Sequence, residues 1–169
     1  MLRVALLLTV VVGLLAIVPV RDRLRSHRAA ASFGAQVVAV LDGDTVIVRM
    51  PEGGEERVRL IGVDTPEIAH DGNPRQCYSR RAMRFVRRAA LHRRVELTPG
   101  RERRDRYRRL LAYVRVAGST GDLEEQLLRG GLARTLEIAP NIDRAERYRS
   151  VEQAAKAAGH GLWSACPRA

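Results

Sequence analysis

The chain has 169 residues, which is enough for one domain with a hydrophobic core and an additional N-terminal segment. Its 30 basic and 19 acidic residues give a net charge of +11, and because Lys156 is the only lysine, almost all of the positive charge is arginine. Phe, Tyr and Trp number two, four and one, which argues against a protein that grips single strands by stacking many bases. The arginine excess has two interpretations: a polyanionic partner, whose phosphates match the guanidinium fork, or a genome with arginine-rich codon usage.

Residues 4–20 form an almost continuous apolar run that is followed by four arginines between residues 21 and 28. We expect residues 1–20 to be an N-terminal hydrophobic helix that serves as a transmembrane anchor or a signal segment, and residues 21–35 to be a linker. The four arginines occupy the place where a cleavable signal normally has a short uncharged stretch, which favours an uncleaved anchor. By the positive-inside tendency, they would hold the following domain in the cytoplasm.

The two cysteines, Cys77 and Cys166, argue for the opposite orientation. A disulfide between them would tie the end of the chain to the middle of the domain, and it would persist only outside the reducing cytoplasm. Two unrelated thiols are the alternative. We therefore expect a monomer that is anchored in the cell membrane or secreted, with its folded domain outside the cytoplasm.

Short apolar segments from residue 36 onward predict β-strands. An apolar run spans residues 37–41, and apolar residues alternate with others in residues 46–50 and 58–62. A turn at residues 51–55 separates the last two segments, so the three together predict an antiparallel meander. On the third strand, Arg59 points away from its apolar neighbours, as a side chain that contacts a ligand should. Residues 95–97 and 110–114 predict two further strands.

Three amphipathic segments predict helices packed on these strands. Residues 76–91 carry apolar side chains on one side and arginines on the other. A second helix is expected from a cap at Asp122 to residue 129, and a third from near Asp143 to Gly159, with Glu146 completing a capping box. The buried face of the third helix is expected to comprise Tyr148, Val151, Ala155 and Ala158. The prediction is an α+β fold, a small five-stranded β-barrel with three packed helices in a domain of residues 36–166.

Three short polar segments contain the residue types that phosphodiester cleavage needs. They are Asp-Gly-Asp-Thr at 42–45, Arg-Leu-Ile-Gly-Val-Asp-Thr-Pro-Glu at 59–67 and Asp-Arg-Tyr-Arg-Arg at 105–109. Each has an ordinary interpretation on its own: the first is a tight turn, the second a helix cap, and the third belongs to a solvated charged loop at residues 101–109. Together they provide carboxylates for a hard metal ion and two arginines for a phosphate, which indicates metal-assisted cleavage of a phosphodiester.

In order and residue type, these segments resemble the thermonuclease (staphylococcal-nuclease-like, SNase-like) family over roughly residues 36–164. Residues 110–113, 127–133 and 161–164 also match the family. The resemblance implies an OB-fold barrel of five strands with three helices. It also implies a Ca²⁺-dependent endonuclease that hydrolyses DNA and RNA with low sequence specificity. Because exported members carry a similar cysteine pair, it favours the disulfide between Cys77 and Cys166.

The resemblance implies a calcium site. Its ligands would be the carboxylates of Asp44 and Asp64 and the backbone carbonyl of Thr65. Calcium suits such a site because it accepts mixed oxygen ligands in loose geometry and leaves room for water and a phosphate oxygen. Asp42 lies close by, but the resemblance does not make it a direct ligand.

The resemblance also implies catalytic and substrate-binding residues. Arg59 and Arg109 would hold the scissile phosphate and neutralise the charge that grows on its oxygens. Glu67 would act as general base toward the attacking water. Tyr107 and Arg106 would contact the nucleotide.

The chain departs from the family in two places. Residues 134–140 lack the tyrosines that well-studied members carry near the nucleotide, and Arg108 stands where the family often has glycine. Two other interpretations stay open: a non-catalytic nucleic-acid-binding OB-fold module, and an envelope-associated domain whose arginines contact anionic lipid. The chain has the expected acidic residue or arginine at every position of the family site, which favours an enzyme over these two alternatives.

Overall fold

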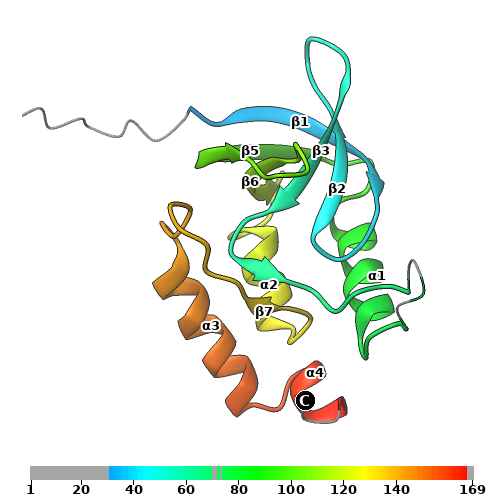
Figure 1. Ribbon diagram of the computed structural model, residues 1–169, viewed down its shortest axis with the longest axis vertical. Helices are drawn as coiled ribbons and strands as arrows, with labels where there is room; N and C mark the ends of the chain where they lie inside the picture. Colours follow the sequence, from blue (N-terminus) through cyan, green and yellow to red (C-terminus); the bar gives the residue numbers. More distant parts are fainter. Residues whose placement is uncertain (1–30, 70–71, 73, 167–169) are drawn as a thin grey trace, which may run out of the picture.

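Five strands close into a β-barrel in the computed structural model, which describes residues 31–69, 72 and 74–166 (Figure 1). The barrel order is β1-β2-β3-β6-β5, and all neighbours are antiparallel except β3 and β6. The strands are β1 (Phe33–Val40), β2 (Thr45–Arg49), β3 (Glu55–Leu60), β5 (Arg94–Arg104) and β6 (Leu110–Val116). The predicted α+β barrel is therefore confirmed.

The alternation of apolar residues builds the barrel interior. Val46 and Val48 on β2 and Val58 and Leu60 on β3 are fully or almost fully buried. Arg59, between the last two, faces the other way and is only partly exposed. The period-two pattern of the sequence is thus the inside–outside pattern of the sheet.

Two strands begin or end elsewhere than expected. β1 begins at Phe33, where it pairs with β5, three residues before the predicted start of the domain at residue 36. β5 continues to Arg104, so four residues that were expected to lie in a charged loop belong to the barrel. Their outward side chains are charged, and such a pattern does not distinguish an exposed strand from a loop.

A second, two-stranded sheet was not predicted. It pairs β4 (Val63–Asp64) with β7 (Arg134–Thr135) outside the barrel. Two-residue strands carry no periodic signal, and their pairing joins segments about 70 residues apart in sequence. This sheet places Asp64 directly opposite Arg134.

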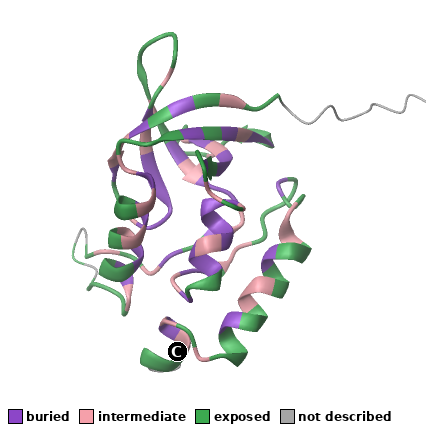
Figure 2. Ribbon diagram, turned by 180° about the vertical axis from the view of Figure 1, so that it is seen from behind, coloured by how far each residue is buried: buried purple, intermediate pink, exposed green. Residues whose placement is uncertain are grey.

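The three predicted helices are present, together with a short fourth one. They are α1 (Ser79–Ala90), α2 (Leu123–Arg129), α3 (Ala145–Ala157) and α4 (Leu162–Ala165). α1 packs on β1 and α2, while α2 lies between β6 and α3 (Figure 1). The outer side of each helix is exposed and its inner side is buried against its neighbours (Figure 2).

The predicted capping box of the third helix is wrong. α3 begins at Ala145, two residues after Asp143, and its N-cap residue Arg144 makes no side-chain cap hydrogen bond. The Asp143 carboxylate instead accepts hydrogen bonds from the Arg101 guanidinium, at 2.6 Å for the shortest. A long-range ion pair has therefore replaced the local cap. Ala158, expected on the buried face, is exposed because the helix ends before it.

A buried polar cluster joins α2 to the barrel and to α3. Asp122 precedes α2, but its carboxylate caps no helix N–H; it accepts a hydrogen bond from the Tyr148 hydroxyl at 3.1 Å and pairs with Arg144. Glu124 is completely buried and accepts the backbone N–H of Val114 with both oxygens, at 3.0 and 3.3 Å. Burial raises the pKa of Glu124 well above its usual value.

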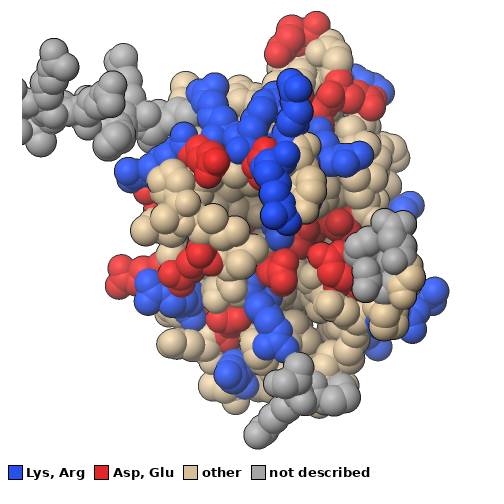
Figure 3. All heavy atoms as spheres, in the orientation of Figure 1, with Lys and Arg blue, Asp and Glu red and all other residues tan. Residues whose placement is uncertain are grey.

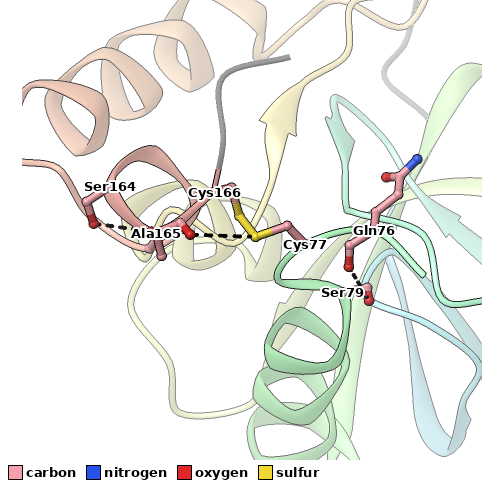
Figure 4. Close-up of a disulfide and its surroundings, with 7 residues drawn as sticks. Gln76, Cys77, Ser79, Ser164, Ala165 and Cys166 are labelled. Carbon is pink, nitrogen blue, oxygen red and sulfur yellow. Dashed lines mark hydrogen bonds between the residues drawn. A yellow bond between two sulfur atoms is a disulfide. The ribbon is translucent and has the colours of Figure 1, made fainter. Parts of the chain in front are cut away.

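A disulfide joins Cys77, just before α1, to Cys166 at the end of α4 (Figure 4). It closes a loop whose ends are 89 residues apart, so the C-terminal end is fixed against the start of α1. The disulfide prediction is confirmed. The predicted hydrophobic segment at residues 1–20 and most of the linker lie outside the described residues. Among the residues that are described, no helix is both long enough and apolar enough to span a membrane.

Candidate active site

The turn between β1 and β2 presents Asp44 toward a neighbouring loop. Within the turn, the Asp42 carboxylate accepts the backbone N–H of Asp44 at 2.9 Å, a side-chain turn typical of aspartate. The turn packs tightly on Thr65, because a Cβ atom added at Gly43 would lie 2.6 Å from the Thr65 Oγ1 atom. The glycine between the two aspartates is therefore required for this close approach.

The Asp44 carboxylate is almost inaccessible to solvent, with 4% of the residue exposed, and is fully engaged. Its Oδ2 atom accepts the backbone N–H of Thr65 at 2.8 Å and the Thr65 hydroxyl at 3.0 Å. Its Oδ1 atom accepts the Thr45 hydroxyl at 3.2 Å and lies 3.2 Å from the Nε atom of Arg59. These contacts connect β2, β3 and the 64–67 segment, and they fix the position of this buried charge.

Arg59 bridges the two predicted metal-binding carboxylates. While Nε contacts Asp44, Nη2 donates to the Asp64 Oδ1 atom at 3.1 Å, and Nη1 donates to the backbone carbonyls of Leu60 and Val63, both at 2.8 Å. The Arg59 side chain is 11% exposed, whereas that of Asp64 is 51% exposed. The structure therefore brings Asp44, Asp64 and Arg59 together at one point.

Negative charge accumulates around Asp44. Burial and the charge of Asp44 raise the pKa of Asp42 to about 6. The same two causes, in the same order, raise the pKa of Asp64, although Arg59 and Arg134 oppose the shift. A group of carboxylates that resists full ionisation is stabilised by any cation that enters among them.

The loop between β5 and β6 contributes Arg109. Its Nε atom donates to the Asp105 Oδ2 atom at 2.6 Å, and its backbone N–H donates to Asp105 Oδ1 at 2.9 Å. Its Nη1 atom lies 3.5 Å from the Thr45 hydroxyl, which itself contacts Asp44. Although burial acts to raise the pKa of Asp105, these hydrogen bonds and the Arg109 charge lower it. Arg109 is thus held beside the carboxylate pair.

The rest of this loop is more exposed. Tyr107 is 62% exposed, and the guanidinium groups of Arg106 and Arg109 lie 4.7 and 5.3 Å from the centre of its ring. Arg108, where the resemblance favours glycine, has φ = 64°. The left-handed turn is therefore kept, and an exposed arginine side chain occupies it.

Glu67 lies on the irregular segment after β4, and it is exposed. Its backbone is held by Gln76: the Glu67 N–H donates to the Gln76 side chain, and the Gln76 N–H donates to the Glu67 carbonyl, both at 2.9 Å. Gln76 immediately precedes the disulfide-bonded Cys77. Gln76 and Arg134 were not predicted to be site residues, because only the folded chain brings them beside the motif.

Arg59 and Arg109 line a cleft of about 440 Å³. Its polar part contains Arg59, Arg109 and Tyr107, and its apolar wall includes Leu136 and Ile138 from the segment after β7. This is the segment that lacks the family's tyrosines. Acidic and basic side chains meet in the middle of the face shown in Figure 3. The cleft therefore combines cationic groups, which suit a phosphate, with an apolar wall.

A divalent cation fits this site in the type of its donors. The Asp44 and Asp64 carboxylates are neighbours, since both lie within 3.2 Å of the Arg59 guanidinium. Both Asp44 oxygens already accept contacts from the protein, whereas Asp64 is more open to a cation. Hard cations such as Ca²⁺ prefer oxygen ligands and accept backbone carbonyls and water as the others. No larger cluster is available, since three or more His, Cys, Asp or Glu side chains arranged to hold a metal do not occur in the described part of the chain.

Comparison with known proteins shows to which family the chain belongs. The sequence model of the family described as "Staphylococcal nuclease homologue" matches residues 57–165. The thermonuclease of Staphylococcus hyicus is 36% identical over 129 residues, which are 76% of this chain and 75% of that protein. The thermonuclease of Staphylococcus intermedius is 47% identical over 78 residues, or 46% of each chain. The probable endonuclease LCL3 of Komagataella phaffii is 37% identical over 111 residues, which are 63% of this chain and 48% of that protein.

The barrel and these relatives place the chain in the class of nuclease-like proteins. The chain belongs to the staphylococcal nuclease family. Its match spans about half the length of two of the relatives named and three quarters of the third.

Proposed function

We propose that the protein is a Ca²⁺-dependent endonuclease that hydrolyses the phosphodiester bonds of DNA and RNA with low sequence specificity. The observation that carries the proposal is that Asp44 and Asp64 both contact Arg59, with Arg109 close by, and that the two arginines line a cleft. These groups come from three separate sequence segments, and they combine cation-binding and phosphate-binding chemistry at a single point.

The two arginines are suited to a phosphate. Four of the five N–H groups of Arg59 are accounted for by its contacts with Asp44, Asp64 and two carbonyls, which orient the guanidinium and leave one N–H of Nη2 for a substrate oxygen. Arg109 is oriented by Asp105. Prepositioned cations of this kind stabilise the charge that develops on phosphate oxygens during hydrolysis.

Asp44, Asp64 and the carbonyl of Thr65 would hold calcium. When bound, the ion would supply a Lewis acid that polarises a phosphate oxygen. Arg59 already neutralises part of the carboxylate charge, which leaves Asp64, the more exposed partner, as the accessible ligand. The raised pKa of Asp64 is consistent with a site that favours an additional cation.

Glu67 would take a proton from the attacking water. It is exposed, three residues after Asp64, on a segment whose backbone Gln76 holds by two hydrogen bonds. Tyr107 and Arg106 would contact the nucleotide from the edge of the cleft, where both are exposed.

The disulfide supports a location outside the cytoplasm, because such bonds persist in oxidising compartments. We propose a monomer, with residues 1–20 as the anchor or signal segment, residues 21–35 as the linker, and residues 36–166 as the catalytic domain.

The test is digestion of plasmid DNA and of RNA by the full chain, with Ca²⁺ and with a calcium chelator. We expect cleavage of both polymers with calcium only. Glu67→Gln should reduce turnover by about 10²-fold or more without weakening calcium-dependent nucleotide binding. Glu52→Gln, an exposed carboxylate in the β2–β3 turn, is the control and should leave turnover unchanged. Nucleic-acid binding without cleavage at any calcium concentration would instead identify a non-catalytic OB-fold module.

A further inference from the structure

Helix α1 carries a concentration of positive charge that is separate from the candidate active site. Residues 74–94 contain eight arginines and no Asp or Glu, so this stretch accounts for eight of the eleven net positive charges. Five of them, Arg80, Arg81, Arg84, Arg87 and Arg88, lie on α1, and all five are exposed. Arg and Lys atoms project from the edge of the molecule beside α1 in Figure 3.

These five guanidinium groups differ from several exposed arginines elsewhere in the domain. Arg49, Arg101 and Arg149 are exposed as well, but each is paired with a carboxylate. Within the described residues, none of the five on α1 lies in an ion pair. Their charge therefore stays available to an external anion.

Three of them face a built cavity. Arg81, Arg84 and Arg88 follow the helical spacing that places side chains on one face, and together they line a hollow of about 290 Å³ between α1 and the chain at Gly130 and Gly161. The Arg81 guanidinium lies 5.3 Å from the centre of the Tyr78 ring, which also lines the hollow. This contact orients the guanidinium without neutralising it. The hollow and the candidate active-site cleft share no lining residue.

We propose that Arg81, Arg84 and Arg88 form a second phosphate-binding surface, which holds the backbone of a polynucleotide at a distance from the cleft. The inference rests on the proposed action on nucleic acids, and it deepens it: long strands engage both surfaces, whereas a dinucleotide engages only the cleft. A guanidinium group binds two phosphate oxygens at once, and a row of guanidinium groups can bind the nucleic-acid backbone without contacting the bases.

An anionic membrane is the less suitable partner. Helices that lie in a membrane interface combine basic residues with exposed large apolar side chains. The exposed large apolar side chains of the described residues are Leu41, Tyr107, Ile138 and Ile142, and none of them belongs to α1. The apolar side of α1 is occupied, since Ala82, Val86 and Ala90 are buried against the barrel.

The experiment compares two triple variants of the full chain. One removes the charges of the hollow (Arg81→Gln, Arg84→Gln, Arg88→Gln), and the matched control removes three paired charges (Arg49→Gln, Arg101→Gln, Arg149→Gln). Binding of a 30-nucleotide single strand is measured by fluorescence anisotropy, in chelator and over a range of salt concentrations, so that no cleavage is needed. Thermal unfolding confirms that both variants are folded.

We expect the α1 variant to bind the 30-nucleotide strand about 10- to 100-fold more weakly at 50 mM salt. The slope of log affinity against log salt should fall in magnitude by about 2, since each lost phosphate contact to a single strand removes about 0.7. The control should change the slope by less than about 0.5, the value expected when the removed charges are already neutralised. Hydrolysis of a dinucleotide should be unchanged in both variants.

Three results would overturn the inference: an unchanged slope in the α1 variant, an equal loss in the control, or loss of sedimentation with phosphatidylserine vesicles while strand binding is kept. The last result would assign the surface to a membrane. Because binding is measured without calcium, the outcome is independent of whether the cleft cleaves. If the protein does not hydrolyse nucleic acid but shows the expected slopes, the proposed function is wrong, whereas the second phosphate-binding surface is supported.

Discussion

Removal of the Cys77–Cys166 disulfide provides a quantitative test of how the fold supports the site. The bond connects residues 89 apart. In the loop-entropy description, a cross-link of this length stabilises the folded state by about 4.5 kcal/mol at 25 °C. For a domain of this size, each kcal/mol corresponds to about 2–4 °C in Tm, so the double variant Cys77→Ala, Cys166→Ala should melt about 10–18 °C lower.

The same change should reach the candidate active site. Gln76 precedes Cys77 and holds the backbone of Glu67 through two hydrogen bonds, while the disulfide lines a hollow together with Asp64 and Thr65. Without the cross-link, this segment samples more conformations, and cleavage should slow at temperatures well below the new Tm. The decrease should appear in kcat, because the arginines proposed to bind the phosphate are attached to other elements.

The assay is thermal and urea unfolding followed by circular dichroism, together with plasmid cleavage at 20 °C. The wild-type chain treated with a phosphine reductant is the control, since it loses the bond without losing the sulfur atoms. Both samples should show the same loss of stability. A Tm decrease below about 3 °C, with an unchanged dependence on urea, would refute the view that the long cross-link holds the C-terminal end in place.

Three further substitutions test separate parts of the structure. Gly43→Ala should destabilise the fold by about 1–3 kcal/mol in urea unfolding, because its Cβ would lie 2.6 Å from Thr65 Oγ1; Gly34→Ala, which meets no atom within 4 Å, is the control, and equal effects would contradict the steric argument. Arg59→Lys keeps the charge but loses the planar set of contacts to two carboxylates and two carbonyls, so plasmid cleavage should fall by about 10²-fold or more; near wild-type kcat would remove Arg59 from phosphate binding. Glu124→Gln tests the buried acid, whose raised folded-state pKa gives stability that is complete below the unfolded pKa of about 4.3 and is lost as pH rises toward the folded pKa. The Gln side chain keeps an acceptor for the backbone N–H and does not titrate, so the Tm of the variant should depend less on pH than that of the wild type and be higher at neutral pH. Parallel curves of Tm against pH for the variant and the wild type would show that this carboxyl does not titrate in the range measured.

Local patterns in the sequence predicted the main elements of the fold. The alternation of Val46, Val48, Val58 and Leu60 with outward-facing residues identified the barrel strands, and the apolar face of residues 76–91 identified α1. Such patterns succeed because each one reports which side of a single element faces the core. They fail where an element is too short or too polar, as in the two-residue strands β4 and β7 and the charged end of β5.

Competing partners account for the wrong details. Asp143 and Asp122 both have the sequence position of a helix cap, but Asp143 binds Arg101 and Asp122 binds Tyr148 and Arg144. A cap is a local hydrogen bond worth about 1 kcal/mol, and a cationic partner from a distant segment can displace it. The sequence contains the helix N–H groups and the distant cationic residues alike, but it does not determine which of them the aspartate will contact.

The sequence by itself determined the chemical groups of this protein: two aspartates and a glutamate near two arginines in type and order, two cysteines, and a basic stretch without acids. Only the tertiary structure decided their spatial relations, namely that Arg59 lies between Asp44 and Asp64, that Gln76 holds Glu67, and that the arginines of α1 remain unpaired within the described residues. The physical reason is that residue identity and spacing define local conformation. Distances between segments, in contrast, depend on how the barrel closes and which surfaces it buries.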